Sequence, residues 1–95
     1  MAQDWIQILL SHWNIHVAAV RLLPGAASST QGNLPSKSDE VLLVLEGEVE
    51  AEIGNERARL GAGAVVLVPA GTPHRFINTG KTKAVAFCVY GPSLV

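Results

Sequence analysis

The sequence predicts an all-β domain, an antiparallel barrel or jelly roll. Roughly eight short apolar segments alternate with turns rich in glycine and proline, a pattern typical of small barrels and sandwiches. No segment of useful length repeats its apolar residues at a helical period. Hydrophobic residues, mostly Val, Leu, Ala and Ile, make up 48% of the chain. The 95 residues suffice for one domain with one modest core.

The N-terminal part contains two predicted strands and a polar loop. Residues 4–10 and 13–22 are rich in strand-forming residues, and we place a turn between them at Ser11–His12. A short helix is the alternative for residues 4–10. After the second strand, residues 26–39 are rich in Ser, Thr, Asn and Gly, which predicts a loop or a ragged edge.

A long strand follows over residues 40–53 and bends at Gly47. Its first half is apolar on both faces, which predicts burial by the barrel interior on one side and by a neighbouring sheet or subunit on the other. Beyond the bend, glutamates alternate with apolar residues, as in a half-buried strand. Gly54–Asn55 then predicts a hairpin. Its return strand, residues 56–60, brings arginines beside those glutamates, and we expect exposed Glu–Arg pairs across it.

Residues 63–78, GAVVLVPAGTPHRFIN, contain a strand, a turn and a second strand. The run Val65–Val68 is too short for a helix and suits a buried strand. Pro69–Gly71 predicts a tight turn, because proline presets φ at a turn's second position and glycine accepts the positive φ that often follows. In the next strand side chains alternate, so one face carries His74, Phe76 and Asn78.

The last predicted strand covers residues 83–90, after a turn at residues 78–81. Cys88 in this strand is the only cysteine, so the chain can form neither an internal disulfide nor a cysteine-based zinc site. We predict that Cys88 is a small core residue rather than a reactive thiol.

The chain resembles the cupin superfamily in the second of that family's two sequence motifs. The matched residues are Gly63, Pro69, Gly71, His74 and Asn78. The resemblance implies a double-stranded β-helix, the jelly-roll barrel of cupins, with residues 1–95 as one domain and a motif-bearing core over about 24–92. It also implies that the histidine lies inside the barrel, where the family uses it as a metal ligand.

The first cupin motif is present only in its second half. Glu40 and Gly47 match it, with six residues between them. Its two histidines are absent. The three ways of counting the spacing place them at Leu34 and Ser36, at Asn33 and Pro35, or at Gln31 and Asn33.

This departure bears on metal binding. Cupins usually hold a first-row metal with three imidazoles and one carboxylate, whereas only His74 and Glu40 stand at matched positions here. Two ligands are too few for a catalytic zinc site or a 2-His-1-carboxylate iron site. If zinc, nickel, manganese or iron binds, the further ligands would come from His16, His12, Asn33 or Gln31. The alternative for His16 is a hydrogen-bonded strand histidine.

Three functions fit these observations. The first is a small-molecule-binding cupin with a degenerate metal site, in a pocket that we expect to be lined by Glu40, Leu42, His74, Phe76, Tyr90, Gln31 and Asn33. The second is a metal-dependent dioxygenase, isomerase or decarboxylase that uses His74, Glu40 and a further ligand. The third is a sensor or interaction module that acts through a partner. Without a metal, His74 and Glu40 would form either a general acid–base pair or a structural pair.

Charge and composition bear on partners and location. Seven Lys and Arg against eight Asp and Glu leave a net charge of −1 without a basic cluster, so nucleic acid is not an expected partner. The N-terminus lacks the basic residues of a signal peptide, and no apolar run approaches the ~20 residues that span a bilayer. We therefore expect a cytoplasmic protein without membrane contact. The doubly apolar strand after Glu40, together with the resemblance, predicts a homodimer.

Overall fold

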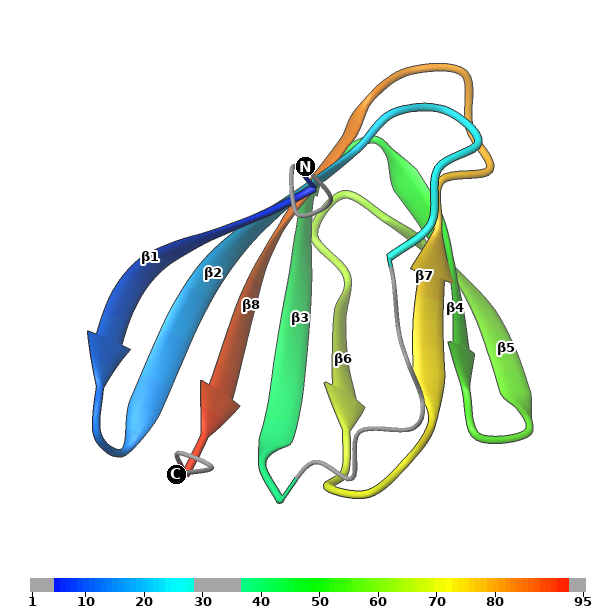
Figure 1. Ribbon diagram of the computed structural model, residues 1–95. Coiled ribbons are helices and arrows are strands. Elements are labelled where there is room, and N and C mark those ends of the chain that lie inside the picture. Colours follow the sequence, from blue (N-terminus) through cyan, green and yellow to red (C-terminus); the bar gives the residue numbers. More distant parts are fainter. Residues whose placement is uncertain (1–4, 29–36, 93–95) are drawn as a thin grey trace.

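The computed structural model describes residues 5–28 and 37–92, which form eight strands and no helix (Figure 1). The strands are β1 (Ile6–His12), β2 (Ile15–Leu22), β3 (Asp39–Glu46), β4 (Glu48–Ile53), β5 (Glu56–Gly61), β6 (Val65–Val68), β7 (His74–Ile77) and β8 (Ala84–Gly91). They build a five-stranded sheet in the order β1-β2-β8-β3-β6 and a three-stranded sheet in the order β5-β4-β7, with every pairing antiparallel. The predicted all-β jelly roll is confirmed.

The predicted strands are present, with two corrections near the N-terminus. Residues 6–12 form a strand, so the helix alternative is wrong. The predicted turn at Ser11–His12 is also wrong, because the chain reverses at Trp13–Asn14. Ser11 and His12 are instead the cross-strand partners of the first two residues of β2, which extends the ladder to the end of the hairpin.

The turn between β6 and β7 contains glycine at positive φ, as predicted. Gly71 has φ of 80°, and the backbone N–H of Thr72 donates to the carbonyl of Pro69 at 3.1 Å, which closes the turn. Pro69 therefore occupies the first turn position rather than the predicted second. The Asp39 side chain accepts a hydrogen bond from the N–H of Ala70 at 2.8 Å, which fixes this turn to the start of β3.

The predicted loop over residues 26–39 begins as an ordered segment along the free edge of β7. Asn78 exchanges two backbone hydrogen bonds of 2.9 Å with Gly25 and Ala26, and the N–H of Ser28 donates to the Phe76 carbonyl at 2.8 Å. The hydroxyl of Ser28 accepts from the N–H of Phe76 at 3.0 Å. This segment therefore protects the edge of the three-stranded sheet.

Gly47 is the point at which the chain passes from the five-stranded sheet to the three-stranded sheet. It lies between β3 and β4 with φ of 76°, a conformation that favours glycine. A Cβ atom at this position would lie 2.6 Å from the carbonyl oxygen of Lys83, the residue before β8. The predicted bend is confirmed, and its cause includes this close backbone approach.

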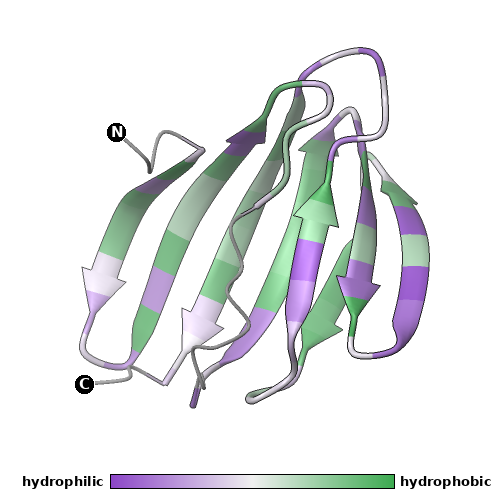
Figure 2. Ribbon diagram, turned by 45° about the vertical axis from the view of Figure 1, so that its right-hand side comes forward, coloured by the Kyte–Doolittle hydropathy of each residue, from purple (hydrophilic) through white to green (hydrophobic). Residues whose placement is uncertain are grey.

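The three-stranded sheet carries the predicted Glu–Arg pairs. Arg57 lies 3.6 Å from Glu52, and Arg59 lies 3.9 Å from Glu48. Arg75 of β7 also contacts Glu52, at 3.0 Å. Figure 2 shows these charges as purple bands on β4, β5 and β7. Because the pairs are exposed or partly exposed, they help to fix strand register more than they stabilise the fold.

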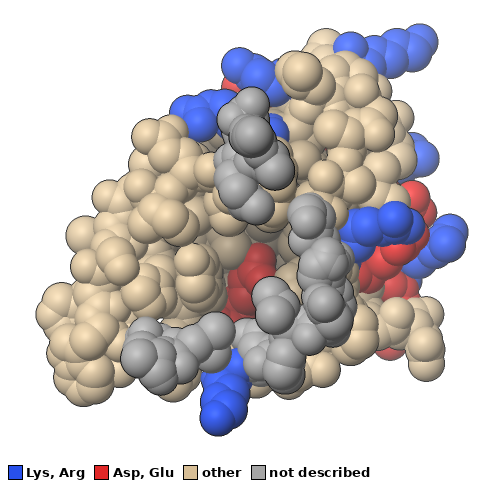
Figure 3. Space-filling model, viewed as in Figure 1, with Lys and Arg blue, Asp and Glu red and all other residues tan. Residues whose placement is uncertain are grey.

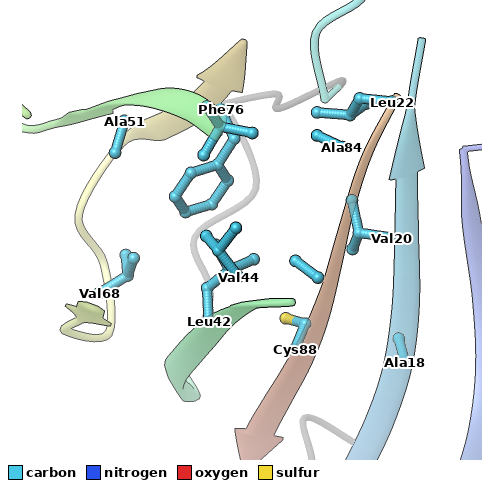
Figure 4. Close-up of a cluster of buried hydrophobic side chains, with 12 residues drawn as sticks. Ala18, Val20, Leu22, Leu42, Val44, Ala51, Val68, Phe76, Ala84 and Cys88 are labelled. Carbon is cyan, nitrogen blue, oxygen red and sulfur yellow. The ribbon is translucent and has the colours of Figure 1, made fainter. Parts of the chain in front are cut away.

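The core lies between the two sheets and receives side chains from both (Figure 4). Its buried members are Ala18, Val20, Leu22, Leu42, Val44, Val49, Ala51, Val68, Phe76, Ala84, Ala86 and Cys88. Within the described residues, no helix is long and apolar enough to cross a membrane.

Candidate functional site

A carboxylate and an imidazole from opposite sheets meet inside the barrel. Glu40 lies near the start of β3 and His74 is the first residue of β7. The Nε2 atom of His74 is 3.0 Å from Oε1 of Glu40, and the two side chains are 25% and 20% exposed. The surface between the sheets is hollowed, with acidic atoms at its bottom (Figure 3). The two residues singled out in the sequence are therefore neighbours at a site that is partly open to solvent.

The hydrogen bonds of His74 define its protonation state. Its Nδ1 atom is 2.9 Å from the carbonyl oxygen of Thr72, which can only accept, so Nδ1 carries a proton. Its Nε2 atom faces a carboxylate oxygen, which accepts when it is ionised. An imidazolium satisfies both contacts at once. The arrangement is therefore a charged pair in which His74 donates from both nitrogens.

Cys88 of β8 completes the contacts of the carboxylate. Its thiol donates to Oε2 of Glu40 at 2.8 Å, while the other carboxylate oxygen accepts from His74. A continuous chain of hydrogen bonds thus runs from β8 through β3 to β7 and joins the two sheets. Charge-assisted hydrogen bonds of this kind are stronger than neutral ones.

The shifts in pKa agree with this charge distribution. Burial raises the pKa of Glu40, but hydrogen bonds from His74 and Cys88 outweigh burial and leave it below its ordinary value. The hydrogen bond to Glu40 raises the pKa of His74, against a smaller opposing effect of burial. Burial raises the pKa of the Cys88 thiol, and the charge of Glu40 raises it further. The thiol is therefore a hydrogen-bond donor at neutral pH, not a nucleophile.

Glu40 belongs to a polar row on the inner face of the five-stranded sheet. Cross-strand register pairs Glu40 with Tyr90, Tyr90 with His16, and His16 with Ser11. The ring of His16 stacks on Tyr90 with centroids 5.2 Å apart, and Nδ1 of His16 lies 2.8 Å from the Ser11 hydroxyl. The hydroxyl of Tyr90 has no hydrogen-bond partner among the described residues, and burial raises its pKa. The row therefore offers a phenol beside the charged pair.

The family model for the cupin domain matches residues 18–90, which include the three-stranded sheet, the five-stranded sheet except β1 and the start of β2, and the charged pair. The chain belongs to the cupin family. It is 38% identical over 66 residues to SCO3923, an uncharacterized protein of Streptomyces coelicolor, across 70% of this chain. The aligned part spans 62% of that relative, which is less than two thirds of its length.

Solved structures share the same fold as this cupin. TT1209 from Thermus thermophilus is 29% identical with a TM-score of 0.83, and the match covers 97% of this chain and 88% of that one. BH2720 from Bacillus halodurans is 21% identical with a TM-score of 0.87, over 96% of this chain and 72% of that one.

The other residues expected to line the cupin pocket lie at different depths. Tyr90 is half-buried beside the charged pair, whereas Leu42 and Phe76 are 1% and 3% exposed and belong to the core. The rings of Phe76 and His74 meet edge to face at a centroid distance of 5.8 Å, so Phe76 packs against the imidazole from the core side. Gln31 and Asn33 lie outside the described residues.

The sequence did not predict that Cys88 and Ser11 belong to the site. Cys88 was expected in the core, where it lies, but its hydrogen bond to Glu40 was not expected. Ser11 was placed in a turn. Their roles depend on strand register, which brings β8 beside β3 and β1 beside β2. The one available signal was that Cys88 and Tyr90 share a face of the last strand.

Members of the cupin family often bind divalent metals, but the donor set of the described residues does not fit one. Within residues 5–28 and 37–92, no group of three His, Cys, Asp or Glu side chains is placed to hold a metal ion. His16 does not join Glu40 and His74, because it contacts Ser11 and stacks on Tyr90 instead. The expected third ligand is therefore not provided by His16, and the pair satisfies its charges internally.

We expect the pair to stabilise the protein most between pH 4.5 and 6.5, the ordinary pKa values of glutamate and histidine. The contribution of His74, whose pKa is raised, is complete below 6.5 and is lost as pH rises through its folded value. The contribution of Glu40, whose pKa is lowered, is complete above 4.5 and is lost as pH falls through its folded value.

Urea unfolding of the wild type and of a Glu40→Gln/His74→Gln double variant across this range tests the expectation. The difference in free energy of unfolding should peak at about 1–3 kcal/mol inside the window and decrease on both sides. A difference that does not change with pH would show that the two residues are not a charged pair.

Proposed function

We propose that this cupin binds a small polar molecule in the hollow between its sheets, at the charged pair and the adjoining polar row. The observation that carries the proposal is the placement of Ser11, His16, Tyr90 and Glu40 in one inward-facing row. A barrel interior that served packing alone would favour apolar side chains there, as in the neighbouring row that contains Ala18, Cys88 and Leu42. Partly exposed polar groups that converge on a hollow are typical of ligand sites.

The chemistry of the row indicates the kind of ligand. His74 is a charged donor, Glu40 a charged acceptor, and the Tyr90 hydroxyl a donor or acceptor without a partner in the described chain. A ligand with both a donor and an acceptor, such as a hydroxy acid or an amide, can contact all three. Leu42 and Phe76 lie in the core behind these polar groups, so the ligand would contact the polar groups and not these two side chains.

Proton transfer is the second candidate function, and it rests on the same pair. His74 carries a proton on Nε2 that faces the carboxylate, so a ligand inserted beside it would meet a general acid next to a general base. An isomerisation that moves a proton between two carbon or oxygen atoms needs this combination. The metal-dependent reactions considered from the sequence lack their ligand set in the described residues.

Ligand screening by NMR tests the proposal with small hydroxy acids, keto acids and amides as probes. We expect at least one probe to shift resonances of the polar row, and its affinity to decrease about tenfold or more in His74→Gln and severalfold in Tyr90→Phe. His12→Gln is the matched control, because His12 is an exposed histidine at the end of β1 and its loss should not change the affinity. A probe whose affinity is unaffected by both site variants would contradict the proposed site.

A further inference from the structure

The rings of His16 and Tyr90 lie side by side on the inner face of the five-stranded sheet. They occupy paired positions on the adjacent strands β2 and β8. Their planes differ by 28° and their centroids are 5.2 Å apart, so the two rings are stacked. Glu40 follows on the next strand, β3, opposite Tyr90. Because these side chains leave the same face of the sheet, the polar ends of the two rings lie beside each other and beside the charged pair.

Each of the two rings has a polar atom that makes no hydrogen bond within residues 5–28 and 37–92. Nδ1 of His16 lies 2.8 Å from the Ser11 hydroxyl, and Nε2 of the same ring has no such contact. The Tyr90 hydroxyl has none either. Both residues are half-buried, so these atoms line the hollow and do not point into bulk solvent. Two polar atoms about one strand spacing apart, ~4.8 Å, are therefore left for a ligand.

The contact with Ser11 bears on what His16 offers to a ligand. When the Ser11 hydroxyl donates to Nδ1, the proton of a neutral imidazole lies on Nε2. A protonated imidazole also donates from Nε2. The phenol of Tyr90 can donate as well. In either of these states the two rings present a pair of donors, an arrangement that suits the two oxygens of a carboxylate.

We propose that His16 and Tyr90 bind the carboxylate of a hydroxy acid whose hydroxyl contacts the charged pair. This inference rests on the proposed function and selects one ligand class and one orientation. A carboxylate at the charged pair would lie directly against Glu40. His16 is two strand spacings from Glu40, about 10 Å, and the Coulomb repulsion between two charges decreases with distance. The uncharged hydroxyl can donate to Glu40 and accept from His74 without such repulsion.

The spacing of the strands selects among hydroxy acids. Tyr90 lies one spacing of about 4.8 Å from Glu40, and His16 lies one spacing further. A 2-hydroxy acid carries its hydroxyl on the carbon next to the carboxylate, so its two polar groups are too close together to reach both places. A 4-hydroxy acid has a longer carbon chain between these groups, with bonds of about 1.5 Å each. We therefore expect the site to prefer the 4-hydroxy isomer.

Titrations with 2-, 3- and 4-hydroxybutyrate, followed by NMR, test the inference. We expect the wild type to bind 4-hydroxybutyrate at least about fivefold more tightly than 2-hydroxybutyrate. His16→Phe keeps a ring beside Tyr90 but removes both nitrogens, so it should lose about tenfold in affinity for 4-hydroxybutyrate and most of the preference between isomers. His12→Phe is the matched control, because His12 is exposed and alternation places it on the opposite face of β1 from Ser11. This variant should bind both isomers as the wild type does.

Measurements on the wild type alone cover the case in which His16→Phe does not fold. Nuclear Overhauser effects in the complex should join the ligand protons beside the carboxylate to the rings of His16 and Tyr90. The protons beside the hydroxyl should be joined to His74. The reverse orientation would overturn the inference. A His16 ring that carries its only proton on Nδ1, detected by nitrogen NMR, would also overturn it, because Nε2 could then not donate.

The inference and the proposed function fail in different ways. Equal affinities for the three isomers, reduced by His74→Gln but not by His16→Phe, would overturn the inference and support the proposed function. Affinities that none of these site variants changes would overturn both. If none of the isomers binds, the inference is wrong, whereas the proposed function is wrong only if the keto acids and amides of its own screen also do not bind.

Discussion

Replacing Asn78 with aspartate is expected to lower the free energy of unfolding by about 3–5 kcal/mol at neutral pH. Asn78 is 1% exposed, and its amide nitrogen donates to the carbonyls of Leu22 and Thr82, both at 2.8 Å. Its amide oxygen accepts from the N–H of Gly80 at 2.8 Å. A carboxylate of the same shape keeps this acceptor but turns two donor contacts into contacts between a negative charge and carbonyl oxygens.

The effect should depend on pH with a defined sign. A buried carboxylate beside two carbonyls has a raised pKa in the folded state, so it destabilises the protein above that pKa. As pH falls, protonation restores one donor and part of the lost stability returns. Urea unfolding at neutral and acidic pH measures both the loss and the recovery.

Asn55→Asp is the matched control for this substitution. Asn55 is exposed in the β4–β5 hairpin, and the same change there should alter stability by less than about 0.5 kcal/mol. Equal effects at the two positions would contradict the assignment of Asn78 as the hydrogen-bonded link between the ends of β2, β7 and β8.

Asn78 also shows what the sequence could and could not predict. Local signals were sufficient for the strand, the turn and the strand that contain His74 and Asn78, because Pro69 and Gly71 determine a reversal and side chains alternate afterwards. Local signals did not predict the hydrogen bonds that Asn78 makes. Gly80 and Thr82 lie in the turn that follows Asn78, but Leu22 is distant in sequence and is brought near only by the closed barrel.

The candidate site was likewise predicted only in part from the sequence. The meeting of Glu40 and His74 followed from matched motif positions, and the structure places them 3.0 Å apart. The hydrogen bond from Cys88 and the stack of His16 on Tyr90 arise from register between strands that are distant in sequence. Alternation predicted the inward face of Phe76 but not its depth, because depth depends on how the second sheet closes over the first.

The sequence pattern indicated that the strand after Glu40 is apolar on both sides, but not that neighbouring strands of the five-stranded sheet also carry exposed apolar side chains, such as Leu67 and Phe87. On β6 the residues Val65 and Leu67 suggested only a buried strand. The sheet order joins these residues to Val41 and Leu43, and then to β8 and β2. The apolar outward side predicted for one strand therefore extends over neighbouring strands of the five-stranded sheet.

The second large loss of stability is expected at Gly47, where the chain passes from the five-stranded sheet to the three-stranded sheet. Gly47→Ala should lower the free energy of unfolding by about 3–4 kcal/mol, from two causes. An L-residue at φ of 76° costs about 1–2 kcal/mol. The added Cβ would also lie 2.6 Å from the carbonyl oxygen of Lys83 and 3.0 Å from Cα of Ala84, both backbone atoms that cannot move without shifting β8.

Gly63→Ala separates the two causes. Gly63 has φ of 93°, but a Cβ there would have no heavy atom within 4 Å, so only the backbone conformation would be strained. We expect this variant to lose about 1–2 kcal/mol. Denaturant unfolding of both variants measures the difference, which should be about 2 kcal/mol and is attributable to the approach of β8. Equal losses would mean that β8 can move away from Gly47 without a loss of stability. Gly47 would then not fix the register of β3 and β8, on which the contact between Glu40 and Cys88 depends.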